Sequence, residues 1–337
     1  MEKLSGKRMK KKKVLITGAA GFIGSHTVDK FIENNFIVYG LDNFSTGNEK
    51  NISHLKSEKN FFFEKIDLLK NINKNFIKDC DYIVHFAGLG DIVPSIEYPN
   101  KYFRNNFNGT LNLLNILSIN KVKKFIYAAS SSCYGLAKTP TNEMANISPE
   151  YPYALSKYLG EQICFHWSKI YKLPVNSLRI FNAYGPRSRT TGTYGAVFGV
   201  FLKQLISNMP LTVVGDGNQK RDFLYISDAA EAFYKASLTK KINQIWNLGS
   251  GKPQSINYLC KLLKAKKILH LPKRPKEPNI TWSDISKIKQ DLNWRPLVSF
   301  EKGVENVIDN IEYWQDAPLW NKNSIKAATK LWFKHLK

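Results

Sequence analysis

A tyrosine and a lysine four residues apart, Tyr153 and Lys157, have the types and spacing that suit proton transfer. They belong to a segment that opens at Pro149 and predicts a long helix to about Lys172, so both side chains lie on one helix face. A cationic lysine near a phenol favours the phenolate and lowers its pKa. Such a phenolate can act as a general base toward the hydroxyl of a sugar or another alcohol.

The same spacing recurs at Tyr134 and Lys138, so it is a weak signal by itself. This second pair encloses Gly135 and is followed by Pro140, which predicts a loop without a shared helical face. Tyr153 is therefore the preferred base. The alternative for Tyr153 is a surface tyrosine beside a solvated lysine.

Three glycines, Gly18, Gly21 and Gly24, follow the apolar run 14–17 and precede apolar residues at helical intervals. A strand, a glycine turn and a helix in this order are the first unit of a dinucleotide-binding fold. The glycines remove side chains, so that backbone N–H groups and the helix N-terminus can approach a pyrophosphate. The alternative is a glycine turn in an ordinary α/β domain.

An acidic residue, Asp42, ends the next apolar run, 18 residues after Gly24. A carboxylate at this point can accept hydrogen bonds from the 2′-hydroxyl of a ribose, and it repels a 2′-phosphate. The sequence therefore favours NAD over NADP as the cofactor.

The elements that position these residues alternate between strands and helices. Strands are expected at 37–42, 61–67, 82–87, 124–130 and 175–182, with a helix at 105–119. This alternation predicts an α/β fold with a Rossmann-type, doubly wound parallel sheet. Ligands bind at the carboxyl ends of such strands, where Asp67, Leu68, Gly88 and Ser130 fall.

Beyond residue 182 the pattern loosens. A helix is expected at 197–207, a strand at 211–214, a helix at 228–238 and a turn at 247–251. We expect a basic disordered tail over 1–13 and an NAD-binding domain over 14–182, to which 221–247 returns. A smaller substrate-binding lobe is expected over 183–220 and 248–337.

Composition narrows the class of protein. With 337 residues and 43% apolar content, the chain fits a soluble globular protein. It has no apolar run of transmembrane length, and its basic start lacks the apolar region of a secretory signal. Its four cysteines have no metal-ligand spacing, so no metal is expected, and few scattered cysteines indicate a reducing, cytoplasmic setting.

The formal net charge is +23. Such a charge is compatible with binding to nucleic acid or to an anionic membrane. The preferred interpretation is a lysine-rich solvated surface and an anionic small-molecule substrate, because no nucleic-acid-binding motif is present. We therefore expect neither nucleic acid nor membrane as a partner.

Taken together, the motifs resemble those of the extended short-chain dehydrogenases/reductases, within the nucleotide-sugar epimerase/dehydratase family. The resemblance covers about residues 12–310 and is closest to the UDP-sugar 4-epimerases. Its motifs are TGAAGFIG at 17–24, LDNFSTG at 41–47, HFAGL at 85–89, SSSCYG at 130–135, YPYALSK at 151–157, RIFNAYGPR at 179–187, GDGNQKRDFLY at 215–225 and TWSDISK at 281–287.

The resemblance implies roles for individual residues. Ser130 and Tyr153 would handle the proton of a sugar hydroxyl, while Lys157 orients the nicotinamide ribose. The residues implied to hold NAD are Gly18, Gly21, Phe22, Ile23, Gly24, Asp42, Asn43, Ser45, Thr46, Gly47, Asp67, Leu68, Phe86, Ala87, Gly88, Tyr153 and Lys157. Those implied to contact the nucleotide sugar are Ser131, Ser132, Asn182, Arg221, Arg274 and Thr281.

For the two arginines the alternative is a surface ion pair. Guanidinium matches phosphate oxygens in a bidentate manner, which favours a diphosphate. The resemblance further implies a homodimer, a place in polysaccharide biosynthesis, and C4 epimerisation through a transient 4-keto sugar. It gives no role to the segment 187–194.

Two other functions stay open. A nucleotide-sugar 4,6-dehydratase needs an added acid and base, which dehydratases of the family place just after the serine or threonine aligned with Ser130. Here Ser131 and Ser132 occupy those positions, and a hydroxyl is a poor acid near neutral pH. A redox sensor or nucleic-acid-binding protein without turnover would not need the set of Ser130, Tyr153 and Lys157.

The sugar itself is addressed by Thr281. By resemblance this position lines the pocket near C2 of the sugar, where a bulky tyrosine would fill the space of a 2-acetamido group. A small threonine predicts that UDP-N-acetylhexosamines are accepted as well as plain UDP-hexoses. The alternative is a strand residue chosen for β propensity.

Overall fold

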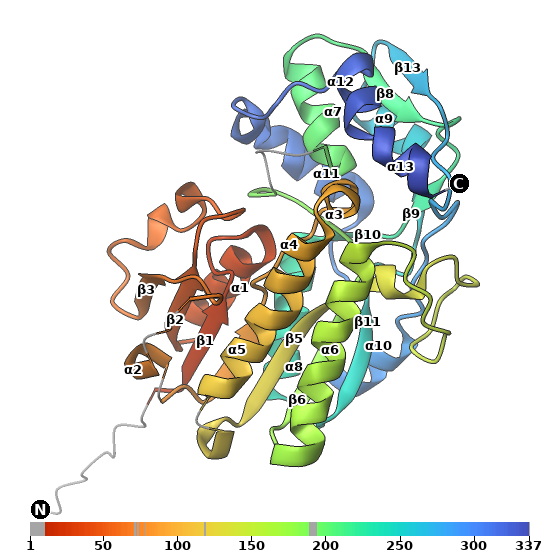
Figure 1. Ribbon diagram of the computed structural model, residues 1–337. Coiled ribbons are helices and arrows are strands. Elements are labelled where there is room, and N and C mark those ends of the chain that lie inside the picture. The colour runs from red at the N-terminus through yellow and green to blue at the C-terminus, as the bar shows by residue number, and fades with distance from the viewer. Residues whose placement is uncertain are drawn as a thin grey trace, which may run out of the picture.

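The computed structural model describes residues 11–70, 72, 74–77, 79–117, 119–188 and 194–336. The basic tail expected over 1–13 lies outside the described residues except for residues 11–13, and the same holds for 189–193 within the segment 187–194. The larger part of the molecule is built on one parallel sheet, and a smaller lobe covers the end of that sheet at which its strands finish (Figure 1).

Seven parallel strands form the central sheet, in the order β11-β6-β5-β4-β1-β2-β3. This topology confirms the predicted Rossmann-type fold, because the order reverses on either side of β1. The strands are β1 (Lys13–Thr17), β2 (Ile37–Asp42), β3 (Phe61–Lys65), β4 (Tyr82–His85), β5 (Lys124–Ser130), β6 (Val175–Ile180) and β11 (Gln244–Leu248).

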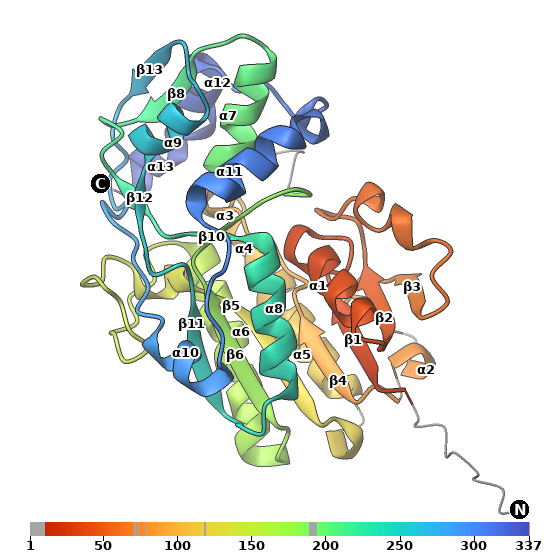
Figure 2. The same ribbon diagram turned by 180° about the vertical axis from the view of Figure 1, so that it is seen from behind.

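Helices cover both faces of this sheet. One face carries α3, α4, α5 and α6, which stand in front of it in Figure 1. The opposite face carries α1, α8 and α10, which come to the front in Figure 2. The bounds of these helices, with the short α2, are α1 (Phe22–Glu33), α2 (Lys74–Ile77), α3 (Ile92–Glu97), α4 (Pro99–Phe103), α5 (Gly109–Ile116), α6 (Pro152–Tyr171), α8 (Ile226–Leu238) and α10 (Ser286–Leu292).

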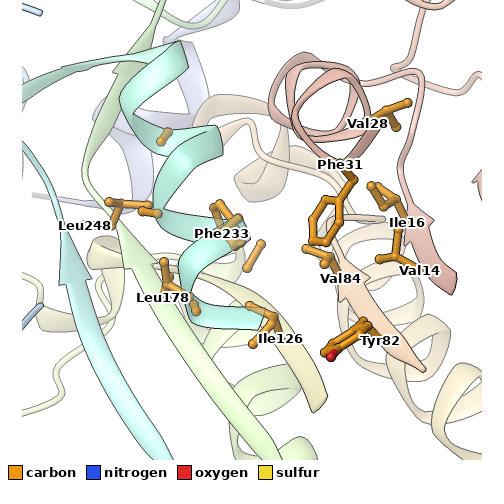
Figure 3. Packing of buried hydrophobic residues seen from close by; sticks show 14 of the residues in the cluster. Val14, Ile16, Val28, Phe31, Tyr82, Val84, Ile126, Leu178, Phe233 and Leu248 are labelled. Carbon is orange, nitrogen blue, oxygen red and sulfur yellow. The ribbon is translucent and has the colours of Figure 1, made fainter. Parts of the chain in front are cut away.

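The hydrophobic core beneath α1 and α8 holds the first glycine turn in place (Figure 3). Val14 and Ile16 of β1 point toward Phe31 of α1, and Ile126 and Leu178 of neighbouring strands pack near Phe233 of α8. All five of these side chains except Leu178 lie in strands or helices on which the cofactor turn depends, and all are fully buried. Burial at this density fixes where β1 ends and α1 begins.

The smaller lobe has a hydrophobic core of its own, with Phe198, Phe201 and Trp314 among its buried members. Its elements lie at the top in Figures 1 and 2. They are joined to the sheet by paired short strands. The elements beyond the central sheet are β7 (Asn182–Tyr184), α7 (Val197–Ile206), β8 (Leu211–Val214), β9 (Lys220–Arg221), β10 (Phe223–Tyr225), β12 (Gln254–Ser255), α9 (Ile256–Leu262), β13 (Ile268–Leu271), α11 (Phe300–Asp309), α12 (Lys322–Ala328) and α13 (Lys330–His335).

Three expected elements differ from the structure. The single strand expected at 175–182 is two strands, because Phe181 N–H donates to Leu248 of the main sheet and Asn182 N–H donates to Asp222 outside it. The helix expected at 105–119 begins with a π-helical turn at Arg104–Asn108, and its α-helical part ends at Ile116. The turn expected at 247–251 starts later, since residues 247 and 248 complete β11.

Candidate functional site

One cavity of about 650 Å³ opens at the carboxyl ends of the central strands, beneath the smaller lobe. It gathers residues that are up to 300 positions apart in the chain, from the first glycine turn to α13. All but one of the residues implied to bind cofactor or substrate line it, and the exception is Gly47. The lining includes Gly18, Gly21, Phe22, Ile23, Gly24, Asp42, Asn43, Ser45, Thr46, Asp67, Leu68, Phe86, Ala87, Gly88, Ser130, Ser131, Ser132, Tyr153, Lys157, Asn182, Arg221, Arg274 and Thr281.

The glycine turn between β1 and α1 brings backbone amides to one wall of the cavity. Gly18 has a φ of +72°, and a Cβ there would lie 2.9 Å from the backbone nitrogen of Ala87. A Cβ at Gly24 would collide with the carbonyl oxygen of Gly18, so neither position accepts a side chain. The N-terminus of α1 therefore faces the cavity with no side chain in front of it, which suits a phosphate anion.

Asp42, at the end of β2, is a second feature of that wall. Its carboxylate oxygens accept hydrogen bonds from Ala20 N–H at 3.0 Å and Phe44 N–H at 2.8 Å. Burial raises the pKa of Asp42, while the backbone donors oppose that rise. Gly47 approaches from the following loop, and a Cβ there would lie 2.8 Å from each carboxylate oxygen. Gly47 thus shapes the loop around Asp42 instead of lining the cavity.

Two further loops complete this end of the cavity. Asp67 accepts a hydrogen bond from Leu69 N–H at 2.9 Å, which fixes the turn after β3. After β4, Leu89 N–H donates to Asn106 Oδ1 at 2.7 Å, and Asn106 leaves no room for a Cβ at Gly88. Phe86 lies between these segments and packs edge-on against Phe233 of α8, with ring centres 4.5 Å apart.

Ser130 and Tyr153 meet near the middle of the cavity. Ser130 ends β5, and its hydroxyl accepts a hydrogen bond from Ser132 N–H at 3.2 Å. Tyr153 lies in the first turn of α6 and is partly exposed to the cavity. Burial of its hydroxyl raises the pKa of Tyr153, the hydrogen bond with Ser130 lowers it, and the nearby Asp91 raises it.

Lys157 follows one turn later on α6 and is almost fully buried. Its ammonium lies 4.4 Å from the centre of the Tyr127 ring, a cation–π contact. Burial lowers the pKa of Lys157 to about 8, although Cys164 and Glu161 act in the opposite direction. Lys157 is therefore a buried cation whose charge depends on pH close to neutrality.

Tyr134 also lines the cavity, but its hydroxyl is occupied. It donates to Asn247 Oδ1 at 2.7 Å and accepts from Arg179 Nη1 at 2.9 Å. Arg179 is in turn paired with Glu161 at 2.7 Å in the interior. Lys138 is exposed in a loop, so Tyr134 and Lys138 share no helix. This tyrosine belongs to a buried polar network.

The opposite end of the cavity carries the two arginines. Arg221 Nη2 lies 2.9 Å from Glu277 Oε1, and Arg274 Nε lies 2.9 Å from Glu277 Oε2. The two arginine side chains are only 12% and 16% exposed, so these ion pairs are inside the cavity and not on the outer surface. Because one carboxylate joins both guanidinium groups, it holds them close together.

Asn182 and Thr281 lie on the wall between the two ends. The Thr281 hydroxyl donates to Asn182 Oδ1 at 2.9 Å and accepts from Asp222 N–H at 3.1 Å. Asp222 itself is fully buried and accepts from Ser283 N–H at 2.8 Å. The small side chain of Thr281 is thereby fixed in orientation.

Sequence reasoning missed several lining residues. Glu277 and Trp332 have no recognisable motif, and only their positions in the folded chain bring them to the cavity. Tyr194 belongs to the segment without an assigned role, and it packs against Trp320 with ring centres 5.4 Å apart. A signal was available for Glu277 alone, since an acidic residue three positions after Arg274 is typical of a local ion pair.

The two lobes also contact each other beside the cofactor wall. Arg187, which has a φ of +62°, places Nη1 2.6 Å from Asp29 Oδ2 of α1. His26, one turn earlier on α1, lies 3.0 Å from the carbonyl oxygen of Pro186. Arg187 therefore ties the lobe loop to the helix whose N-terminus faces the cavity.

Two properties of the described part of the chain bear on its function. No helix there combines the length and apolar character needed to cross a membrane. Across those same residues, no three His, Cys, Asp or Glu side chains are grouped so that they could hold a metal ion.

Comparisons with known proteins agree with this geometry. The model of the NAD dependent epimerase/dehydratase family matches residues 14–249. A UDP-glucuronate 4-epimerase of Thermodesulfobacterium geofontis is 32% identical over 329 residues, which cover 93% of this chain and 97% of that protein.

Two solved structures are also similar. The UDP-glucuronic acid 4-epimerase of Bacillus cereus, in complex with UDP-glucuronic acid and NAD, has a TM-score of 0.82 and 33% identity, covering 89% of this chain and 99% of its own. The UDP-N-acetylglucosamine 4-epimerase of Methanobrevibacter ruminantium, in complex with UDP-N-acetylmuramic acid, has a TM-score of 0.82 and 31% identity, covering 90% and 100%.

Proposed function

Because the chain belongs to the NAD-dependent epimerase/dehydratase family, we propose that it inverts the configuration at C4 of a UDP-sugar, with NAD as a tightly bound cofactor. It is then an isomerase. The observation that carries the proposal is the hydrogen bond between Ser130 and Tyr153. It lies in a single cavity that has a cofactor wall at one end and two arginines at the other.

The cofactor wall fits NAD. The open N-terminus of α1 and the bare amides of the glycine turn suit its pyrophosphate, and Asp42 suits the two hydroxyls of its adenosine ribose. When bound, NAD supplies the hydride acceptor and donor for C4 of the sugar. Lys157 is assigned to orient the nicotinamide ribose.

Tyr153 is assigned as the group that moves the proton. Its phenolate accepts the proton of the sugar O4 as C4 is oxidised to a ketone, and it returns that proton when C4 is reduced. Ser130 donates to the phenolate and thereby favours it over the neutral phenol. The buried surroundings exclude water, which strengthens this hydrogen bond.

The arginine end holds the nucleotide while the sugar turns. Arg221 and Arg274 match the diphosphate, since guanidinium pairs with phosphate oxygens in a bidentate manner. A sugar tethered only through this diphosphate can rotate and present its other face to the same carbon-bound hydride. Asn182, Ser131, Ser132 and Thr281 are assigned to the sugar end, where small polar side chains leave room for that rotation.

A 4,6-dehydratase is the alternative on this scaffold. Elimination of water across C5 and C6 needs an acid and a base beside the sugar, and the two positions after Ser130 provide only the hydroxyls of Ser131 and Ser132. This composition supports epimerisation.

The test is to incubate the purified protein separately with UDP-glucose, UDP-galactose, UDP-N-acetylglucosamine and UDP-N-acetylgalactosamine. An epimerase converts either member of a C4 pair into the same equilibrium mixture, which proton NMR resolves. A product lighter by one water would instead establish a dehydratase. Tight, salt-sensitive RNA or DNA binding without turnover would indicate the sensor function.

Finer properties form part of the same proposal. The enzyme is assigned as a cytoplasmic homodimer that supplies polysaccharide biosynthesis. The exposed apolar side chains of Leu155, Ile170 and Tyr171 on α6 support pairing of subunits through that helix. The four cysteines are unpaired, which supports a reducing compartment. Light scattering on the eluting protein measures the oligomeric state.

A further inference from the structure

The C-terminal helix α13 places one side chain, Trp332, in the cavity. We propose that Trp332 is a positioning residue for substrate binding: it holds the Arg274 guanidinium in the orientation that grips the diphosphate. This inference rests on the proposed function, because it concerns the same arginine. It also extends the substrate site 83 residues beyond the part of the chain that the family model matches.

Two aromatic rings contact the Arg274 guanidinium. Its central carbon lies 5.3 Å from the centre of the Trp332 ring and 5.6 Å from the centre of the Tyr194 ring. Both rings are buried, with 3% and 5% of their surfaces exposed. A planar guanidinium against such rings loses rotational freedom and is shielded from water, so its attraction to an anion grows.

Trp332 also fixes the backbone that carries the arginine. Its indole N–H donates to the carbonyl oxygen of Pro275, the next residue, at 2.8 Å. Glu277 contacts Arg274 at Nε, so this ion pair does not use the fork formed by the two terminal amino groups. That fork is the part of guanidinium that matches two phosphate oxygens.

The same tryptophan reaches the start of the helix that carries Tyr153. The Trp332 ring lies 5.7 Å from the ring of Tyr151, the residue that precedes α6. Trp332, Tyr151 and Ala154 form a small hydrophobic cluster, against which Tyr153 packs. One side chain therefore links the arginine end of the cavity to the catalytic end, and this distinguishes it from a residue that merely fills the lobe core.

The test uses the full-length protein with its cofactor. W332A removes the ring, W332F keeps a smaller ring without the indole donor, and F333A is the matched control. Phe333 is the next residue on α13, but it lines an outer groove and not the cavity. UDP affinity is measured by calorimetry, and KM and kcat are measured with the UDP-sugar that the protein turns over.

For W332A we expect about tenfold weaker UDP binding and a similar rise in KM, which is the scale of a shielded cation–π contact. The kcat should change much less than KM, since proton transfer at Tyr153 does not pass through Arg274. W332F should lose less affinity than W332A, and F333A should match the native protein. A purely structural tryptophan would lower kcat and thermal stability together without this selective change.

A double-mutant cycle with R274K separates the two kinds of role, because lysine lacks the planar group that the ring holds. In the R274K background, W332A and W332F should weaken UDP binding far less than in the native background. Equal losses in both backgrounds, or native UDP affinity in W332A, would overturn the proposal.

If W332A does not fold, the cycle with W332F decides the question by the same comparison. Failure of the proposed function looks different, because the native protein itself would then bind no UDP and turn over no UDP-sugar.

Discussion

The Thr281 hydroxyl donates a hydrogen bond to Asn182 Oδ1 at 2.9 Å, across the wall of the cavity at which the sugar is expected. This bond uses the only hydrogen that Thr281 can donate. The threonine therefore contributes a fixed, small surface and not a free donor. Its size is then the property that bears on which sugars are accepted.

We expect T281Y to lose at least about tenfold in kcat/KM on UDP-N-acetylglucosamine and UDP-N-acetylgalactosamine while UDP-glucose and UDP-galactose are spared. An added ring penalises only the ligand that needs the space. Kinetics on all four sugars measure the change, and T281V is the control of similar size. A native enzyme that uses UDP-galactose but ignores UDP-N-acetylgalactosamine would contradict the prediction.

Removal of the Tyr153 hydroxyl should lower kcat by about a hundredfold to ten-thousandfold, the usual scale of general base catalysis. Y153F keeps the ring packing, so UDP-sugar binding should persist in calorimetry. The control is Y134F, which has the same spacing from a lysine but a hydroxyl engaged by Asn247 and Arg179.

Y134F should instead lower the free energy of unfolding by about 1–3 kcal/mol, because it leaves buried polar partners unsatisfied. Its activity per folded molecule should stay within a few-fold of native. If the two variants exchanged these effects, the assignment of the base would be wrong.

Much of this site follows from sequence because its parts are local. The glycine turn, Asp42 and the pair Tyr153 and Lys157 each belong to one element and its neighbouring loop, and periodicity places them. The parallel sheet follows from the alternation of strands and helices. The cofactor end was therefore the more predictable one.

The arginine end was less predictable because it is assembled from distant segments. Arg221 and Arg274 were expected from family motifs, but their shared partner Glu277 depends on how residues 274–278 return to the cavity. The contacts of Trp332 depend on a helix near the end of the chain. The change of partner strand at Phe181 likewise depends on Asp222, 41 residues later, which no local pattern encodes.

Loss of the Ser130 hydroxyl should move the pH dependence of activity. The hydrogen bond with Ser130 lowers the pKa of Tyr153, so S130A raises that pKa. The base must be deprotonated to act, and the acidic limb of the kcat profile should therefore shift to higher pH. The profile of S131A, a neighbouring hydroxyl on the same turn, serves as the comparison, and an unshifted S130A limb would argue against the assigned contact.

Asp42 should control how firmly NAD is held. Its carboxylate accepts two backbone hydrogen bonds that fix the loop around it. D42N halves the charge-assisted accepting capacity at that point and should lower NAD affinity by about tenfold. The measurement is the NAD recovered after gel filtration and denaturation, with E49Q on the same loop as the control. Native protein that released NADP would show that Asp42 has a different role.

The last prediction concerns acid stability and His26. Burial lowers the pKa of His26 to about 4, and the cation of Arg187 lowers it further, whereas Asp29 and the carbonyl of Pro186 act in the opposite direction and His54 in the same one. The folded state thus keeps His26 neutral at a pH where the unfolded chain, with a pKa near 6.5, already binds a proton. Below that value the unfolded state gains protons first, so stability falls with pH.

Between pH 7 and pH 4.5 this group alone should cost about 2–3 kcal/mol of unfolding free energy. H26N should be somewhat less stable than native protein at pH 7, because it changes the contact with Pro186, yet it should lose less stability on acidification. Urea unfolding at a series of pH values, at equal NAD occupancy, measures both curves.

The matched comparison is H54N, since His54 contacts the same Asp29 at 2.8 Å but is much more exposed. H54N should keep the native slope against pH. Parallel curves for H26N and native protein would mean that His26 is not the group that couples acidification to the contact between the lobes, and that the buried carboxylates carry the acid sensitivity instead.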